Sequence, residues 1–169
     1  MSARSSLILG GARSGKSARA LALATDRPRI FLATAEALDD EMSERIALHK
    51  AERGADWGLI EAPLDIADPV AEAETGTLVI DCLTLWLSNL MHHGRDIAQE
   101  TTGLLQAIEN ARARVIFVSN EVGLSIAPEN ALARRFRDAQ GRLNQQVASA
   151  VDHVEFMAAG LPMTLKGAP

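Results

Sequence analysis

Short apolar runs alternate with amphipathic stretches along most of this chain, and residues typical of turns bound the runs. This alternation is typical of an α/β layered fold, in which a mostly parallel sheet is covered by helices on both faces. The last two runs flank Gly160 and are predicted to form an antiparallel hairpin. The candidate strands are Ser6–Leu9, Arg29–Ala33, Gly58–Glu61, Thr77–Asp81, Val115–Ser119, Val154–Met157 and Pro162–Leu165.

Two other stretches have helical periodicity. The clearer one is Glu129–Val151, whose apolar stripe should face the sheet. The second is Asp39–Arg53, which opens with acidic residues suited to the positive end of a helix dipole. The stripe of the first helix consists of Leu132, Phe136, Ala139, Leu143 and Val147.

The polar stretch His92–Thr102 contains Gly94 and few large apolar residues. It therefore predicts a loop that leads into a helix near Gly103–Arg112. His92, His93 and His153 are interpreted as loop or strand-start residues. No repeat, linker or low-complexity tract divides the chain, so one domain over residues 1–169 is expected.

Composition, net charge and cysteine content indicate which classes of protein this chain can belong to. Of the 169 residues, 47% are hydrophobic and 23% are charged, as in ordinary globular domains. A net charge of −5, with no basic run longer than residues 134–137, argues against a nucleic-acid partner. Cys82 is the single cysteine, which excludes an internal disulfide and predicts a small core residue. No apolar run approaches membrane-spanning length and no leader pattern opens the chain, so a cytoplasmic protein without a membrane span is expected.

The segment from Gly10 to Ser17 carries the candidate chemistry. It fits the pattern G-x-x-x-x-G-K-[ST], follows an apolar strand and precedes a helical stretch, which is the setting of a phosphate-binding P-loop. Its glycines let successive backbone N–H groups point at phosphate oxygens, and Lys16 is expected to contact the β- and γ-phosphates. The loop residues are Gly10, Gly11, Ala12, Arg13, Ser14, Gly15, Lys16 and Ser17.

A Mg²⁺ site is predicted beside this loop. Ser17 offers a hydroxyl, and Asp81 offers a carboxylate at the end of an apolar strand. An acid in that position lies beside the loop in P-loop enzymes, and Mg²⁺ takes few protein ligands. The segment 120–123 also follows a predicted strand, where open α/β sheets place ligands, so a substrate-side role is expected for it.

Further blocks of residues match one family. Together with the P-loop they span nearly the whole chain, and their combination is far more specific than the P-loop alone. On these blocks, the chain resembles the bifunctional adenosylcobinamide kinase/adenosylcobinamide-phosphate guanylyltransferases of cobalamin biosynthesis. The blocks are Ala33–Ala35 with Asp39–Met42, Arg45–Lys50, Ser119–Gly123, Pro128–Asn130, Arg135–Asp138 and Gly141–Gln145.

The resemblance implies an enzyme that uses ATP, GTP and a corrinoid. Adenosylcobinamide is phosphorylated first, and His49 then accepts GMP from GTP and passes it to the phosphorylated corrinoid. A neutral imidazole nitrogen can attack the α-phosphorus in this way and expel pyrophosphate. The resemblance also implies a homotrimer. By the same resemblance, the nucleotide pocket is lined by Ala33, Thr34, Ala35, Lys50, Arg53 and Glu61.

Two alternatives stay open at this point. In a monofunctional P-loop small-molecule kinase, His49 would be structural and no nucleotide would become attached to the protein. In a nucleotide-switched binding protein, slow hydrolysis would act through partners and would not depend on a corrinoid. The residues around His49 favour the two-step enzyme over both.

Overall fold

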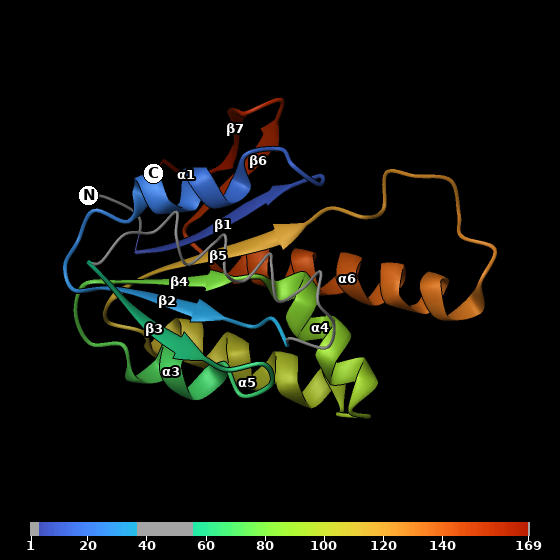
Figure 1. Cartoon of the computed structure of the whole chain (residues 1–169), viewed down its shortest axis with the longest axis horizontal. Coiled ribbons are helices and arrows are strands. Elements are labelled where there is room, and N and C mark those ends of the chain that lie inside the picture. The colour runs from blue at the N-terminus through green and yellow to red at the C-terminus, as the bar shows by residue number, and fades with distance from the viewer. Residues whose placement is uncertain (1–3, 37–55, 169) are drawn as a thin grey trace.

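The computed structural model describes residues 4–36 and 56–168 and contains one seven-stranded sheet (Figure 1). The strand order is β3-β2-β4-β5-β1-β6-β7, in which neighbouring strands up to β6 are parallel and β7 is antiparallel to β6. This arrangement confirms the predicted α/β layered fold with a C-terminal hairpin. The strands are β1 Ser5–Gly10, β2 Arg29–Ala33, β3 Trp57–Glu61, β4 Thr77–Asp81, β5 Arg114–Asn120, β6 His153–Ala158 and β7 Leu161–Lys166.

Helices cover both faces of the sheet (Figure 1). Among the described helices, α1 covers one face, and the other helices cover the opposite face. A buried apolar cluster fills the space on each side, and Cys82 belongs to the cluster under α1, as predicted for a core residue. No described helix combines the length and the hydropathy that crossing a membrane requires. The helices are α1 Lys16–Leu23, α3 Ala67–Glu72, α4 Leu83–His92, α5 Ile97–Asn110 and α6 Ala131–Ala150.

Strand β1 lies in the interior of the sheet, between β5 and β6. All six of its residues are buried, and the uninterrupted apolar run Leu7-Ile8-Leu9 is typical of a parallel strand covered on both faces. Its side chains alternate between the two apolar clusters, with Ile8 on the α1 side and Leu7 and Leu9 on the other. The carboxyl end of β1 therefore leads the chain out of the middle of the sheet.

The predicted loop over His92–Thr102 is wrong for most of its length. His92 ends α4, and α5 begins at Ile97, because the carboxylate of Asp96 accepts hydrogen bonds from two backbone N–H groups of the first turn (2.9 and 3.1 Å). The first turn of α5, Ile97–Glu100, contains no fully buried residue. Its buried face begins only at Thr101 and continues through Leu104 and Ile108, so the apolar signal starts late.

Helix α6 was predicted to face the sheet along its whole length, and this holds only for its second half. Leu143 and Val147 are buried in the core, whereas the side chain of Leu132 is 61% exposed. The amino-terminal half of α6 extends beyond the carboxyl ends of the strands, so no sheet lies beneath it (Figure 1). The apolar period predicted the helix correctly, but it did not indicate where the sheet ends.

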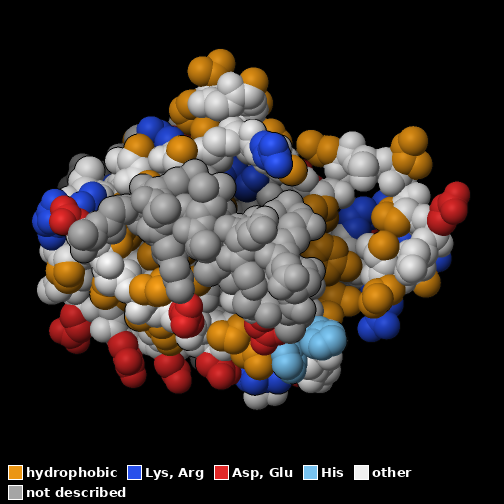
Figure 2. Space-filling model, in the orientation of Figure 1, with side chains coloured by type: hydrophobic (Ala, Val, Ile, Leu, Met, Phe, Trp, Pro, Cys, Tyr) orange, Lys and Arg blue, Asp and Glu red, His pale blue; other side chains and the backbone are white. Residues whose placement is uncertain are grey.

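A buried ion pair joins α1 to the β6–β7 hairpin. The guanidinium of Arg19 donates two hydrogen bonds of 2.7 Å to the carboxylate of Glu155, whose side chain is 2% exposed. Residues beyond Glu155 continue into β7, which is exposed along its whole length. Figure 2 shows hydrophobic side chains on this projecting hairpin, and Leu161 and Met163 are among the exposed apolar residues.

Replacement of Glu155 by Gln should lower the free energy of unfolding by about 2 kcal/mol at pH 7, because the charge-assisted pair is lost in a buried setting. The hydrogen bonds from Arg19 hold the pKa of Glu155 below its ordinary value of 4.5, against the opposing effect of burial. The carboxylate therefore stabilises the fold fully above pH 4.5 and loses this effect as the pH falls through its lower folded pKa. Urea unfolding of both proteins from pH 7 to pH 3 measures the difference.

The matched control is Glu74→Gln, since Glu74 pairs with Arg112 at 3.3 Å but both side chains are largely exposed. This control should change the free energy of unfolding by less than about 0.5 kcal/mol. Equal effects of the two substitutions at pH 7, or a Glu155→Gln effect that does not shrink in acid, would show that the ion pair does not hold the hairpin.

Candidate active site

The predicted P-loop connects β1 to α1 at the carboxyl edge of the sheet. Gly10 ends β1 with φ of +154°, and Gly15 precedes α1 with φ of +95°. Side chains strain the backbone at such angles, so both positions favour glycine. Helix α1 begins at Lys16, and its unpaired N–H groups and positive dipole end face the loop. This strand-loop-helix setting is suited to binding phosphate.

Close packing against the β6–β7 hairpin restricts the shape of the loop. A Cβ atom on Gly10 would lie 2.7 Å from the carbonyl oxygen of Met157 in β6 and 2.6 Å from Oγ of Ser14. A Cβ atom on Gly15 would lie 3.3 Å from Cα of Gly160, at the turn of the hairpin. The N–H of Gly160 donates to the carbonyl oxygen of Ser14 (3.0 Å). The hairpin thus supports one side of the P-loop.

Lys16 lies near the end of the P-loop, and its side chain is buried against the backbone of the loop. Its Nζ donates to the carbonyl oxygen of Gly11, and the residue is 8% exposed. Burial lowers the pKa of its ammonium, and the negative charge of Asp81 partly opposes this effect. Among the described residues, Ser14 Oγ is buried without a hydrogen-bond partner. A buried hydroxyl of this kind and a lysine folded over the loop both fit a cradle for phosphate oxygens.

The structure brings the two predicted Mg²⁺ ligands together. Ser17 is the second residue of α1, Asp81 is the last residue of β4, and Ser17 Oγ lies 3.4 Å from Asp81 Oδ2. A hydroxyl and a carboxylate are oxygen ligands of the kind that Mg²⁺ prefers, so this pair fits that ion. Elsewhere in the described ranges, no group of three or more His, Cys, Asp or Glu residues is arranged to hold a metal ion.

Thr34 is fully buried at the carboxyl end of β2, and its hydroxyl is used within the protein. Oγ1 donates to the carbonyl oxygen of Cys82 (2.8 Å) and accepts from the Cys82 N–H (2.9 Å). Thr34 therefore fixes the backbone that directly follows Asp81. Burial also raises the pKa of the Cys82 thiol to about 11, so this thiol stays protonated at neutral pH.

Asn89 of α4 is a buried polar residue that the sequence did not single out. Its Nδ2 donates to the carbonyl oxygens of Thr34 (2.7 Å) and Pro63 (3.0 Å), which follow β2 and β3. One side chain thus ties together the segments that leave two neighbouring strands. An asparagine in a largely apolar helix was the available signal, but which carbonyls it meets depends on the packing of α4.

The other predicted pocket residues fall in two groups. Ala33 and Glu61 end adjacent strands and pair in register, and Ala33 also pairs with Asp81 of β4. Ala35 follows Thr34 along the same edge. The second group, which includes the predicted nucleophile, lies outside the described residues and consists of His49, Lys50 and Arg53.

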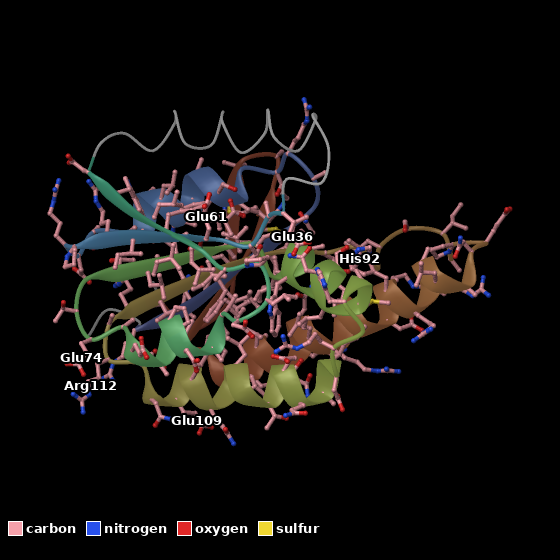
Figure 3. The ribbon with its side chains drawn as sticks, turned by 60° about the horizontal axis from the view of Figure 1, so that its bottom comes forward. Glu36, Glu61, Glu74, His92, Glu109 and Arg112 are labelled. Atoms are coloured by element: carbon pink, nitrogen blue, oxygen red, sulfur yellow. The ribbon has the colours of Figure 1, made fainter. Side chains whose placement is uncertain are left out.

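Glu36 is a further acid at this edge. Its Oε1 lies 3.1 Å from Nε2 of His93, just beyond α4. Figure 3 shows Glu36 and Glu61 on the side of the sheet away from Glu109.

Glu109 helps to line a hollow of about 580 Å³, together with Arg4 and Ser5 at the start of β1. This hollow lies at the amino end of β1, and the P-loop lies at its carboxyl end.

A phosphate cradle beside a Ser–Asp pair, on a parallel sheet of this order, defines a P-loop nucleotide-binding protein. Solved structures share the fold. The chain matches an ATPase from the type III secretion system of pathogenic bacteria with a TM-score of 0.55 and 15% identity, over 95% of this chain and 56% of that one. It also matches the P4 protein from bacteriophage phi6 in complex with ADP, with a TM-score of 0.51 and 15% identity. This match covers 95% of this chain and 54% of the P4 chain. The chain thus spans about half the length of these structures.

Sequence comparison identifies the family. The family model described as "Cobinamide kinase / cobinamide phosphate guanyltransferase" matches residues 6–165. The bifunctional adenosylcobalamin biosynthesis protein CobP of Pseudomonas aeruginosa is 46% identical over 169 residues, covering 96% of this chain and 98% of the relative. The bifunctional adenosylcobalamin biosynthesis protein CobU of Salmonella typhimurium is 38% identical over 178 residues, covering 95% of this chain and 98% of the relative. The chain therefore belongs to the cobinamide kinase/cobinamide phosphate guanylyltransferase family, which confirms the predicted family and enzyme class.

Substitution of Gly10 by Ala should lower the free energy of unfolding by about 2 kcal/mol or more, because its Cβ would meet the backbone of β6 at 2.7 Å. Gly11→Ala is the matched control in the same loop, since a Cβ there would have no atom within 4 Å. Urea unfolding without nucleotide measures both variants. Equal losses would show that contact with the hairpin does not set the path of the loop.

Proposed function

We propose that this enzyme phosphorylates the hydroxyl of adenosylcobinamide with ATP or GTP, and then transfers GMP from GTP to the phosphorylated product through a His49-GMP intermediate. The product of the second step is adenosylcobinamide-GDP. One observation carries the first step: Lys16, Ser17 and Asp81 converge at a loop shaped for phosphate. The near full-length similarity to relatives named bifunctional supports the second step.

Catalysis of the kinase step is assigned to positioning and charge. The loop N–H groups and Lys16 hold the β- and γ-phosphates while the corrinoid hydroxyl oxygen approaches the γ-phosphorus. Mg²⁺ would be held by Ser17 and Asp81 and would neutralise phosphate charge there. The segment after β5 exposes Leu124 and Ile126, which offers apolar contact to a corrin ring beside the loop.

The guanylyl step uses the imidazole of His49 as a nucleophile. A ring nitrogen forms a bond to the α-phosphorus of GTP, and the bond from that phosphorus to the pyrophosphate oxygen breaks. A phosphate oxygen of the corrinoid then attacks the same phosphorus and releases the imidazole. We assign the cationic groups Lys50 and Arg53 to this pocket, where they offset phosphate charge. Glu61 and the segment Ala33–Ala35 complete it from the ends of β3 and β2.

We also assign a homotrimer in the cytoplasm. The apolar face of β7 supports assembly, because Leu161, Met163 and Leu165 alternate along an edge strand and are 68%, 56% and 59% exposed. Alternate residues of a strand share one face, so these side chains form a continuous surface that a second copy would cover.

The His49→Ala enzyme should phosphorylate adenosylcobinamide at a rate within about threefold of wild type but form no adenosylcobinamide-GDP, since only the second step needs the imidazole. Lys16→Ala should slow the kinase step by about a hundredfold or more, because it removes a positive charge from the transferring phosphoryl group. Chromatography of the corrinoid products after incubation with GTP and Mg²⁺ measures both activities.

His92→Ala is the control, since His92 ends α4 outside the P-loop. It should leave both products at wild-type levels. Formation of adenosylcobinamide-GDP by the His49→Ala enzyme would contradict the covalent route. A wild-type enzyme that yields only the phosphorylated corrinoid would identify a plain kinase.

A further inference from the structure

The last residue of β5 lies directly beside the first residue of the P-loop. Asn120 is paired with Gly10 in the parallel register of β5 and β1. The next N–H along the chain, that of Glu121, donates to the carbonyl oxygen of Gly10 (3.0 Å). Asn120 is therefore held at the point where the phosphate-binding loop leaves the sheet.

Strand alternation defines the face on which the Asn120 side chain lies. Ile116 and Val118 belong to the apolar cluster under α1, whereas the hydroxyl of Ser119 donates to Oδ1 of Asn144 in α6 on the opposite face (2.7 Å). Asn120 therefore shares the face of Ile116 and Val118. By the same alternation Asp81 lies on this face, since Val79 belongs to the cluster under α1. The Asn120 amide and the Asp81 carboxylate thus share the α1 face of the sheet, on two neighbouring strands that lie on the same side of β1.

Both backbone groups of Asn120 are held by side chains from helices. The hydroxyl of Thr84, at the start of α4, accepts from the Asn120 N–H (2.8 Å). The Nδ2 of Asn144 in α6 donates to the Asn120 carbonyl oxygen (3.1 Å). Neither contact uses the Asn120 side chain, and no hydrogen bond joins its amide to another of the described residues, while its backbone is held from two sides.

A buried polar network stands behind this position. Ser119, Gln140 and Asn144 are 0%, 0% and 5% exposed. The Nε2 of Gln140 donates to Oγ of Ser119 (3.0 Å) and to Oδ1 of Asn144 (2.9 Å). Burying three polar side chains is costly unless they are hydrogen-bonded, and here three hydrogen bonds join them, while Gln140 Oε1 is buried without a partner among the described residues. These hydrogen bonds therefore fix the position of the end of β5.

We propose that the side-chain amide of Asn120 donates a hydrogen bond to the terminal phosphate of the triphosphate in the P-loop, and that Thr84 and Asn144 position it. A neutral amide donor suits a phosphate oxygen because it adds a directed hydrogen bond without changing the net charge of the site. The terminal phosphate distinguishes a triphosphate from a diphosphate, so Asn120 confers preference for the triphosphate. This inference rests on the proposed use of a triphosphate at the P-loop.

The test compares the binding of GDP and a non-hydrolysable GTP analogue by calorimetry in the presence of Mg²⁺. Asn120→Ala should weaken binding of the analogue about tenfold and leave GDP binding within about twofold, because only the analogue carries a terminal phosphate. The isosteric Asn120→Asp should weaken the analogue further, since its carboxylate repels phosphate. The control Asn110→Ala, at the end of α5, should change neither affinity.

The positioning role of Thr84 has its own readout. Thr84→Val removes the acceptor for the Asn120 N–H at nearly constant volume, so it should reproduce the selective loss of analogue affinity. Thr84→Ser keeps the hydroxyl, so this variant should bind the GTP analogue with wild-type affinity. In kinase assays both the Asn120→Ala and Thr84→Val enzymes should show a lower kcat with an unchanged KM for the corrinoid.

Equal weakening of GDP and the analogue by Asn120→Ala, or no weakening of either, would overturn the assignment of the terminal phosphate to Asn120. Failure of Thr84→Ser to restore affinity would overturn the positioning role. A wild-type protein that binds neither nucleotide, with Lys16→Ala behaving identically, would instead overturn the proposed function and the inference with it.

Discussion

The structure depends on one constraint, which is that β1 is buried on both faces and must leave the sheet at its carboxyl end beside two parallel neighbours. β5 lies on one side of it and β6 on the other, so the first turn after Gly10 is enclosed by Asn120 and Met157. Gly10 fits this enclosed position because it has no side chain and readily adopts its φ of +154°. The same turn leaves successive N–H groups unpaired at the start of α1, and these groups make the loop a site for anions.

Several of the buried polar side chains lie at the carboxyl edge of the sheet, on the strands next to that turn. Thr34 and Asn89 join the ends of β2, β3 and β4, while Ser119, Gln140 and Asn144 hold the end of β5. An apolar core alone would fill space but would not fix backbone atoms at the edge of the sheet. These networks fix the backbone next to Asp81 and Asn120, so a bound phosphate chain would meet groups whose positions are already set.

The sequence predicted those features that depend on local patterns. All seven strands and the P-loop follow from apolar runs and glycine spacing, and the family follows from the blocks around Thr34, His49 and Asn120. The start of α5 was missed because its capping residue, Asp96, precedes a first turn in which no side chain is fully buried. The roles of Asn89 and Gln140 could not be predicted, because their partners are distant in sequence and depend on how α4 and α6 pack. The placement of His49 stays a prediction.

The proposed guanylyl transfer requires that this P-loop protein also carry a nucleotide covalently. Mass spectrometry of the intact protein after incubation with GTP and Mg²⁺, without corrinoid, tests it most directly. We expect a mass increase equal to one GMP that is lost in acid and maps to the peptide containing His49. An unchanged mass under conditions in which the protein binds GTP would contradict the covalent step.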